Sequence, residues 1–158
     1  SMDRIVTVSG DAVHEPGNFK VPFGMNQAEL IEAAGGYKVD PEKIISGGPM
    51  MGFSMFTVDV PVTKTSSSIL CFTKDEVAQY EPTACINCGR CVEVCPSRLI
   101  PSRLADYAEH HDEEAFTKHE GLECMECGSC SYVCPAKRQL KQAIGSMRKT
   151  ALANRKKK

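Results

Sequence analysis

The sequence lacks any run of about 18 consecutive apolar residues, the length that a membrane-spanning helix requires. It also lacks a basic and then apolar leader at its start. We therefore expect a soluble protein that stays in the cytosol. The first residues, SMDR, place Ser1 before Met2, which is typical of a cloning remnant, and we expect the 158 residues to be a piece of a longer protein.

A glycine-rich loop with the spacing of a dinucleotide or nucleotide-phosphate site is also missing. The segment SGGPMMG, residues 46–52, does not have that spacing, so we predict no phosphate site there. Two interpretations of this segment stay open. It is either a tight turn with Met50 or Met51 in the local core, or a loop whose methionines pack against a partner or cofactor.

Charge and cysteine are distributed unevenly along the chain. Residues 1–80 carry six basic and ten acidic side chains, whereas residues 81–158 carry thirteen and ten. Eight of the nine cysteines lie in the second half, and the ninth, Cys71, lies in an apolar segment where we expect a buried core thiol. These contrasts predict two domains, residues 1–76 and residues 77–158.

The first domain is predicted to be a small mixed α/β unit. A helix is indicated after residue 26, because Asn26 can cap it, Glu29 stands three residues on, and Gly35-Gly36 supplies the stop. Segments rich in β-branched residues and bounded by turn residues predict strands, the first two forming a hairpin; they are 4–10, 18–24, 43–46, 56–62 and 66–72. One helix across such a sheet gives a β-grasp-like fold.

The second domain contains one cysteine pattern twice. CINCGRCVEVCP, residues 85–96, returns 39 positions later as CMECGSCSYVCP, residues 124–135. Each copy has the form C-x2-C-x2-C-x3-C-P, the run of bacterial two-cluster ferredoxins, in which the fourth Cys binds the other cluster. The pattern predicts two 4Fe-4S clusters and no catalytic side chain. The expected ligand sets are Cys85, Cys88, Cys91 and Cys134 for cluster 1, and Cys124, Cys127, Cys130 and Cys95 for cluster 2.

Three other uses of these thiols fit the pattern less well. Zinc sites are usually built from two separated C-x2-C pairs, without a third Cys or a trailing proline. Disulfides need an oxidising compartment, and no export signal is present. A redox-active C-x2-C motif is expected in a thioredoxin-like βαβ setting, which neither repeat has.

The surroundings of the repeats are predicted to be helical. Apolar residues follow helical spacing along residues 102–116, with Ser102 as the cap, and along a final helix that carries Leu140, Ile144, Met147 and Ala151 on one face. We therefore predict an α-helical ferredoxin domain and an α+β protein overall. From Lys137 onward there are nine basic residues and no acidic one. This basic end is a solvated tail, a contact for an acidic redox partner, or a contact for an anionic membrane surface; no motif indicates nucleic-acid binding.

The order of these parts resembles a known family. A β-grasp unit with TVSGDAVHEPGNFKVPFGMNQAELIEAAGG, the loop SGGPMMG, and then PTACINCGRCVEVCP and LECMECGSCSYVCPAK resemble the carboxy-terminal portion of the RnfC family, which belongs to the Rnf (Rsx) electron-transport complex. The resemblance implies a β-grasp domain of the soluble-ligand-binding type (SLBB). It also implies a peripheral subunit on the cytoplasmic face of the membrane, which passes electrons between NADH and ferredoxin and docks on membrane subunits that move ions.

The resemblance also sets limits on this chain. The region that would bind FMN and NADH is expected upstream and is missing, so we expect this fragment alone not to be catalytic. Two hypotheses stay open: an electron relay within a membrane-bound ion-translocating oxidoreductase, with the other subunits and a ferredoxin-like protein as partners, or a structural or redox-sensing iron-sulfur scaffold without catalytic electron transfer.

Overall fold

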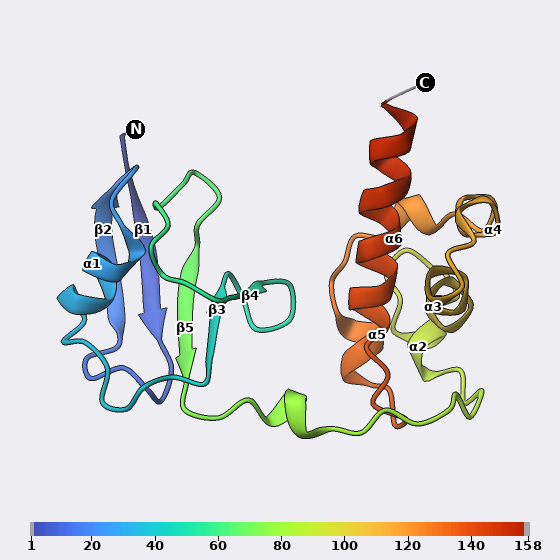
Figure 1. Cartoon of the computed structure of the whole chain (residues 1–158), viewed down its shortest axis with the longest axis horizontal. Helices are drawn as coiled ribbons and strands as arrows, with labels where there is room; N and C mark the ends of the chain where they lie inside the picture. The colour runs from blue at the N-terminus through green and yellow to red at the C-terminus, as the bar shows by residue number, and fades with distance from the viewer. Residues whose placement is uncertain (1, 157–158) are drawn as a thin grey trace. The chain divides into compact units, whose positions relative to one another are not determined.

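The computed structural model describes residues 2–156 (Figure 1). The chain divides into two compact units, of which the first ends at Gln79 and the second starts at Tyr80. A short 3-10 helix, η1 (Glu76–Gln79), closes the first unit. The predicted domain boundary after residue 76 falls inside this helix and stays a prediction.

A five-stranded mixed sheet forms the first unit, in the order β2-β1-β5-β3-β4. Neighbouring strands are antiparallel except β1 and β5, which are parallel. The predicted hairpin is confirmed, as are the strands predicted at 43–46 and 66–72. The strands are β1 (Asp3–Ser9), β2 (Gly17–Pro22), β3 (Lys43–Ser46), β4 (Phe53–Met55) and β5 (Ser68–Phe72).

The strand predicted at 56–62 is wrong. The structure places the edge strand β4 earlier, at Phe53–Met55. Residues 56–62 instead run beside the segment that leads into the helix, where the Val62 N–H donates to the Met25 carbonyl at 2.7 Å. Pro61 has no N–H to give to a ladder, so this apolar segment makes isolated contacts rather than a strand.

The predicted helix of the first unit is confirmed as α1 (Gln27–Ala33). The Asn26 side chain caps it by accepting from the Ala28 N–H at 2.9 Å. Gly35 and Gly36 end it in the left-handed region, with φ of 79° and 74°, where a side chain would be strained. The buried side of α1 joins the core of the sheet, which includes Val6, Val8, Val21, Leu30, Ile31, Val62, Ile69 and Cys71.

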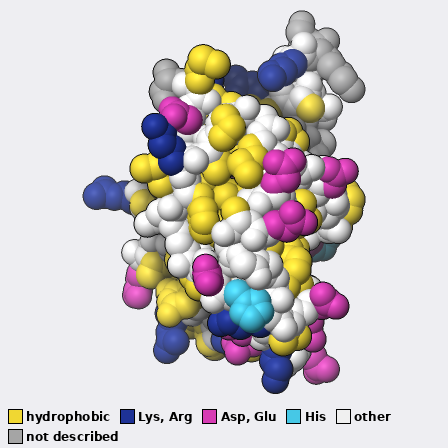
Figure 2. Space-filling view, turned by 90° about the vertical axis from the view of Figure 1, so that its left-hand side faces the viewer, with side chains coloured by type: hydrophobic (Ala, Val, Ile, Leu, Met, Phe, Trp, Pro, Cys, Tyr) yellow, Lys and Arg dark blue, Asp and Glu magenta, His cyan; other side chains and the backbone are white. Residues whose placement is uncertain are grey.

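The first unit therefore has the predicted β-grasp arrangement of one helix with a mixed sheet. Cys71 is fully buried in its core, and burial raises the pKa of this thiol to about 11. Figure 2 shows one face of the sheet unit, on which exposed hydrophobic side chains lie among charged ones of both signs.

The second unit is helical, and none of its described residues, 80–156, lies in a strand. The stripe predicted on the final helix is confirmed, because all four of its residues are buried. Residues 157 and 158 of the basic end lie outside the described residues. The helices are α2 (Arg90–Glu93), α3 (Pro101–Glu109), α4 (Glu113–Lys118), η2 (Gly121–Glu123), α5 (Ser129–Tyr132) and α6 (Leu140–Arg155).

The single helix predicted over residues 102–116 is wrong, because two helices occupy this stretch. His111 adopts a left-handed conformation with φ of 56°, which ends α3. Asp112 then caps α4 by accepting from the Ala115 N–H at 2.9 Å. The predicted Ser102 cap is also wrong, since α3 already begins at the preceding proline and has no side-chain cap.

Candidate functional site

The two cysteine repeats fold in the same way. In the first, Asn87 and then Gly89 adopt positive φ values of 54° and 78°, and the one-turn helix α2 follows. In the second, Glu126 and Gly128 do the same, with φ of 56° and 83°, before α5. Left-handed residues reverse the chain sharply, so three thiols spaced three residues apart are turned toward one side of each loop.

One cavity of about 450 Å³, here called site 1, is lined by residues of both repeats. Three of its cysteines come from the first repeat, and the fourth, Cys134, comes from the end of the second. Cys85 and Cys88 are exposed, so water reaches this site readily. The cysteines of site 1 are Cys85, Cys88, Cys91 and Cys134.

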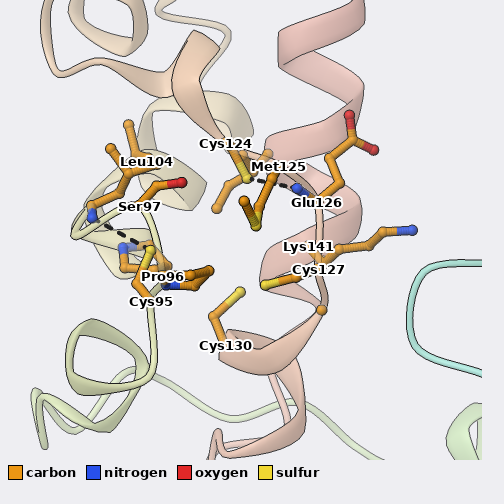
Figure 3. Close-up of a pocket in the computed structure, with 14 residues that line it drawn as sticks. Cys95, Pro96, Ser97, Leu104, Cys124, Met125, Glu126, Cys127, Cys130 and Lys141 are labelled. Atoms are coloured by element: carbon orange, nitrogen blue, oxygen red, sulfur yellow. Dashed lines mark hydrogen bonds between the residues drawn. The ribbon is translucent and has the colours of Figure 1, made fainter.

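A second, much smaller cavity of about 20 Å³, here called site 2, is lined by the other four cysteines of the two repeats. Cys95, from the end of the first repeat, lines it together with three cysteines of the second. Figure 3 shows the four sulfurs arranged around a common space, with Met125 beside them. The cysteines of site 2 are Cys95, Cys124, Cys127 and Cys130.

The thiols of site 2 are less exposed than Cys85 and Cys88 of site 1. Burial raises the pKa of Cys124 and raises that of Cys130 to about 11. Hydrogen bonds with the Ser129 hydroxyl and backbone lower the pKa of Cys127. Because only a thiolate binds iron, the buried thiols release protons when metal binds at neutral pH.

Backbone groups also approach the sulfurs of site 2. The Leu99 N–H donates to Cys95 Sγ at 3.4 Å, and the Glu126 N–H donates to Cys124 Sγ at 3.4 Å. Such bonds stabilise negative charge on sulfur and fix the direction of each side chain.

The thiols are held in place by the helical core of the second unit. Five of the eight cysteines pack against a cluster of buried residues contributed mainly by α3, α4 and α6. Loss of this core would therefore release cysteines of both sites. The cluster is Leu99, Leu104, Ala105, Ala108, Phe116, Leu140, Ile144 and Met147, and the cysteines are Cys91, Cys95, Cys124, Cys130 and Cys134.

Arg138 is a charged residue of site 1 that sequence reasoning did not single out. It lines the cavity with its side chain only 12% exposed. One guanidinium nitrogen, Nη2, donates to Asp106 at 2.8 Å and to Glu109 at 2.9 Å. Burial lowers the pKa of Arg138, but the two carboxylates more than offset this and raise it above its usual value. Aligning the repeats at their 39-residue offset would have drawn attention to this position.

The loop SGGPMMG of the first unit is a tight turn between β3 and β4, but the expectation that such a turn would place Met50 or Met51 in the local core is wrong. Met50 and Met51 are 43% and 60% exposed, so neither packs in the local core. Gly47 has a φ of 98°, and a Cβ on Gly52 would lie 2.5 Å from the Gly48 carbonyl oxygen. Both positions therefore require glycine.

Two further kinds of site are absent from the described residues, 2–156. No group of three or more His, Cys, Asp or Glu side chains in that range is arranged to hold a single metal ion. Within the same range, no helix combines the length and the apolar character needed to cross a bilayer.

Comparison with known proteins defines the class of each unit. Residues 5–54 match the SLBB domain, and residues 84–138 match the 4Fe-4S dicluster domain. The chain thus combines an SLBB domain with a dicluster ferredoxin domain. The dicluster match and the eight-cysteine pattern support two 4Fe-4S clusters.

Several relatives, all RnfC-type subunits, align with both units. The chain is 42% identical over 154 residues to the relative from the Na(+)-translocating ferredoxin:NAD(+) oxidoreductase complex of Acetobacterium woodii, with 98% of this chain and 35% of the relative aligned. It is 46% identical over 104 residues to the counterpart from the proton-translocating ferredoxin:NAD(+) oxidoreductase complex of Clostridium ljungdahlii, with 66% of this chain and 23% of the relative aligned. It is 39% identical over 119 residues to the counterpart from the ion-translocating oxidoreductase complex of Yersinia enterocolitica, with 75% of this chain and 17% of the relative aligned.

These alignments bear out the resemblance read from the sequence. The chain is homologous to the RnfC subunits of ion-translocating oxidoreductase complexes over most of its length. It spans about a third or less of the length of these relatives.

Proposed function

We propose that the second unit relays electrons through two 4Fe-4S clusters within a peripheral subunit of a membrane-bound, ion-translocating NADH:ferredoxin oxidoreductase. The observation that carries the proposal is the presence of two cavities in one helical unit, each lined by four cysteines drawn from both repeats. The names of the relatives from Acetobacterium woodii and Clostridium ljungdahlii supply the reaction class.

The ligand sets that we propose are the cysteines of the two sites. Site 1 would hold one cluster through Cys85, Cys88, Cys91 and Cys134, and site 2 the other through Cys95, Cys124, Cys127 and Cys130. The donor set fits, because iron-sulfur clusters are held by four thiolates and both cavities offer four. Each bound cluster supplies a one-electron carrier.

The crossed ligand sets would also keep the two carriers close together. Cys91 lies in α2 and Cys95 follows four residues later, just after the helix, so the ligands of different sites are close in the chain. Cys130 and Cys134 repeat this spacing in the second motif. The chain's own contribution is therefore to hold two carriers at short range within one packed core, so that an electron received at one site has a short path to the other.

In the proposed scheme, FMN and NADH bind outside this chain, and other proteins exchange electrons with it. We propose that FMN and NADH bind to a region upstream of this chain, and that the other subunits of the complex and a ferredoxin-like protein are its electron-transfer partners. We further propose that the chain lies on the cytoplasmic face of the membrane. The relatives extend well beyond the aligned segment, which supports a further region beyond this chain.

Reversible electron exchange is the test of the proposed relay. Anaerobically reconstituted protein is titrated through reduction and reoxidation, and then mixed in a stopped-flow instrument with a ferredoxin of opposite redox state. We expect both clusters to cycle without loss of iron and to exchange electrons with ferredoxin at least as fast as the parent complex turns over. Clusters that break down on reduction, or that exchange far more slowly, would instead indicate a structural or redox-sensing scaffold.

A further inference from the structure

The linings of site 1 and site 2 differ in charge at the position four residues after the last cysteine of each repeat. Residue 99 and residue 138 are separated by the same 39 positions as the cysteines. Leu99 lines site 2 and is 5% exposed, whereas Arg138 lines site 1. At this position the repeat therefore places an apolar side chain beside site 2 and a largely buried cation beside site 1, while the charged residues that line site 2 are Lys141 and Glu126.

The charge on Arg138 is held firmly near site 1. Its side chain is 12% exposed, while those of its partners Asp106 and Glu109 are 51% and 53% exposed. Solvent screens exposed charges more than buried ones, so the field of the guanidinium is weakened less than the fields of the carboxylates. Asp106 also lines the cavity and opposes the positive charge of Arg138, whereas Arg103, another lining residue on α3, adds to it.

A 4Fe-4S cluster gains one negative charge when it takes up one electron, so a nearby cation favours the reduced form. Net charge and hydrogen bonding around the sulfurs are established determinants of the potential. We infer that Arg138 raises the reduction potential of the cluster held at site 1 and leaves that of the cluster at site 2 unchanged. This inference rests on the proposed binding of one cluster at each site.

Two substitutions that change the charge near site 1 in opposite directions test this role. Arg138→Leu, which copies the residue of the other repeat, should lower the site 1 potential by roughly a tenfold change in its reduction equilibrium, about 59 mV for one electron. Asp106→Asn should shift the same potential upward. Arg138→Lys keeps the charge and should restore most of the wild-type value. Lys149→Gln, on an exposed part of α6, is the matched control and should move neither potential.

Potentials are measured by redox titration followed by paramagnetic resonance, with iron and sulfide content determined for every variant. The signal of site 1 is identified as the one that Cys88→Ser alters, and that of site 2 as the one that Cys127→Ser alters. These identifications hold whichever repeat supplies the fourth ligand, because Cys88 and Cys127 are inner cysteines of their own repeats.

A structural role for Arg138 gives a different result from an electrostatic one. If it only tied the start of α6 to α3, Arg138→Leu and Asp106→Asn would both loosen the site and would not shift the potential in opposite directions. Clusters that bind normally with an unchanged site 1 potential in Arg138→Leu would overturn the inference alone. A chain that binds no cluster after reconstitution would overturn the proposed function together with it.

Discussion

Cys91 and Cys95 lie within five consecutive residues, yet they line different cavities. Cys91 belongs to α2 and lines site 1, whereas Cys95 follows the helix and lines site 2. Cys130 and Cys134 stand in the reverse relationship in the second repeat. The proposed ligand sets therefore fasten the repeats together, because each repeat gives its last cysteine to the other.

The metal content of the reconstituted protein is the first prediction. Two 4Fe-4S clusters require about eight iron and about eight sulfide per chain. Iron and acid-labile sulfide assays on anaerobically reconstituted protein measure both. Stoichiometric zinc without sulfide would contradict the account, since zinc needs four thiolates but no inorganic sulfur.

Removal of iron should affect the two units differently. Metal-binding energy contributes to folding energy, so the apo protein should lose order over residues 85–135 while the sheet of the first unit persists. Hydrogen exchange with peptide-level resolution reports each segment separately. Equal loss of protection in both units would show that they do not fold independently.

A substitution in the core of the first unit also tests whether the two units fold independently. Leu30 is fully buried in the first unit, and Leu30→Ala should cost about 2 to 5 kcal/mol of its unfolding free energy through lost burial and the cavity left behind. Glu32→Ala, at an exposed position on the same helix, should change it by about 0.5 kcal/mol or less. Denaturant-dependent hydrogen exchange measures both variants. The iron content should stay constant in each, and a parallel fall in iron would count against two separate units.

The stability of the first unit should fall in acid, because the folded structure lowers the pKa of the Asp11 carboxyl. The Thr73 hydroxyl and N–H donate to the Asp11 carboxylate, the N–H at 2.9 Å, and these bonds lower the pKa of Asp11 below 3.8. A carboxyl whose folded pKa is lowered stabilises the fold above its unfolded pKa, and this contribution disappears as the pH falls through the folded value.

Asp11→Asn should therefore be less stable than wild type at pH 7, with the difference shrinking below about pH 4. Hydrogen exchange of the β5 peptide, corrected for its intrinsic pH dependence, measures this difference. Asp40→Asn, at an exposed position, is the control. A difference that stays constant from pH 7 to pH 3 would show that the Asp11 charge contributes nothing.

Local signals in the sequence were enough to predict much of the fold. β-Branched composition, turn residues and the Asn26 cap predicted four of the five strands and α1, because those elements satisfy their own backbone groups by regular patterns. The apolar stripe from Leu140 to Ala151 likewise predicted the buried side of α6.

The failures occurred where a tertiary or single-residue effect decided the outcome. Pro61 prevented a strand despite the valines around it, and the left-handed His111 with the Asp112 cap divided one apparent helix into two. The ion pairs of Arg138 join it to Asp106 and Glu109, 32 and 29 positions away in the sequence, which periodicity does not encode.

Cys134→Ser, followed by paramagnetic resonance, tests the crossed assignment most directly. Ser is a harder and poorer ligand than a thiolate, so the cluster that also depends on Cys88 should lose affinity or one iron, while the cluster that depends on Cys127 persists. Cys95→Ser is the matched variant and should have the reverse effect. If Cys134→Ser instead altered only the cluster that depends on Cys127, each repeat would bind its own cluster and the crossed arrangement would be wrong.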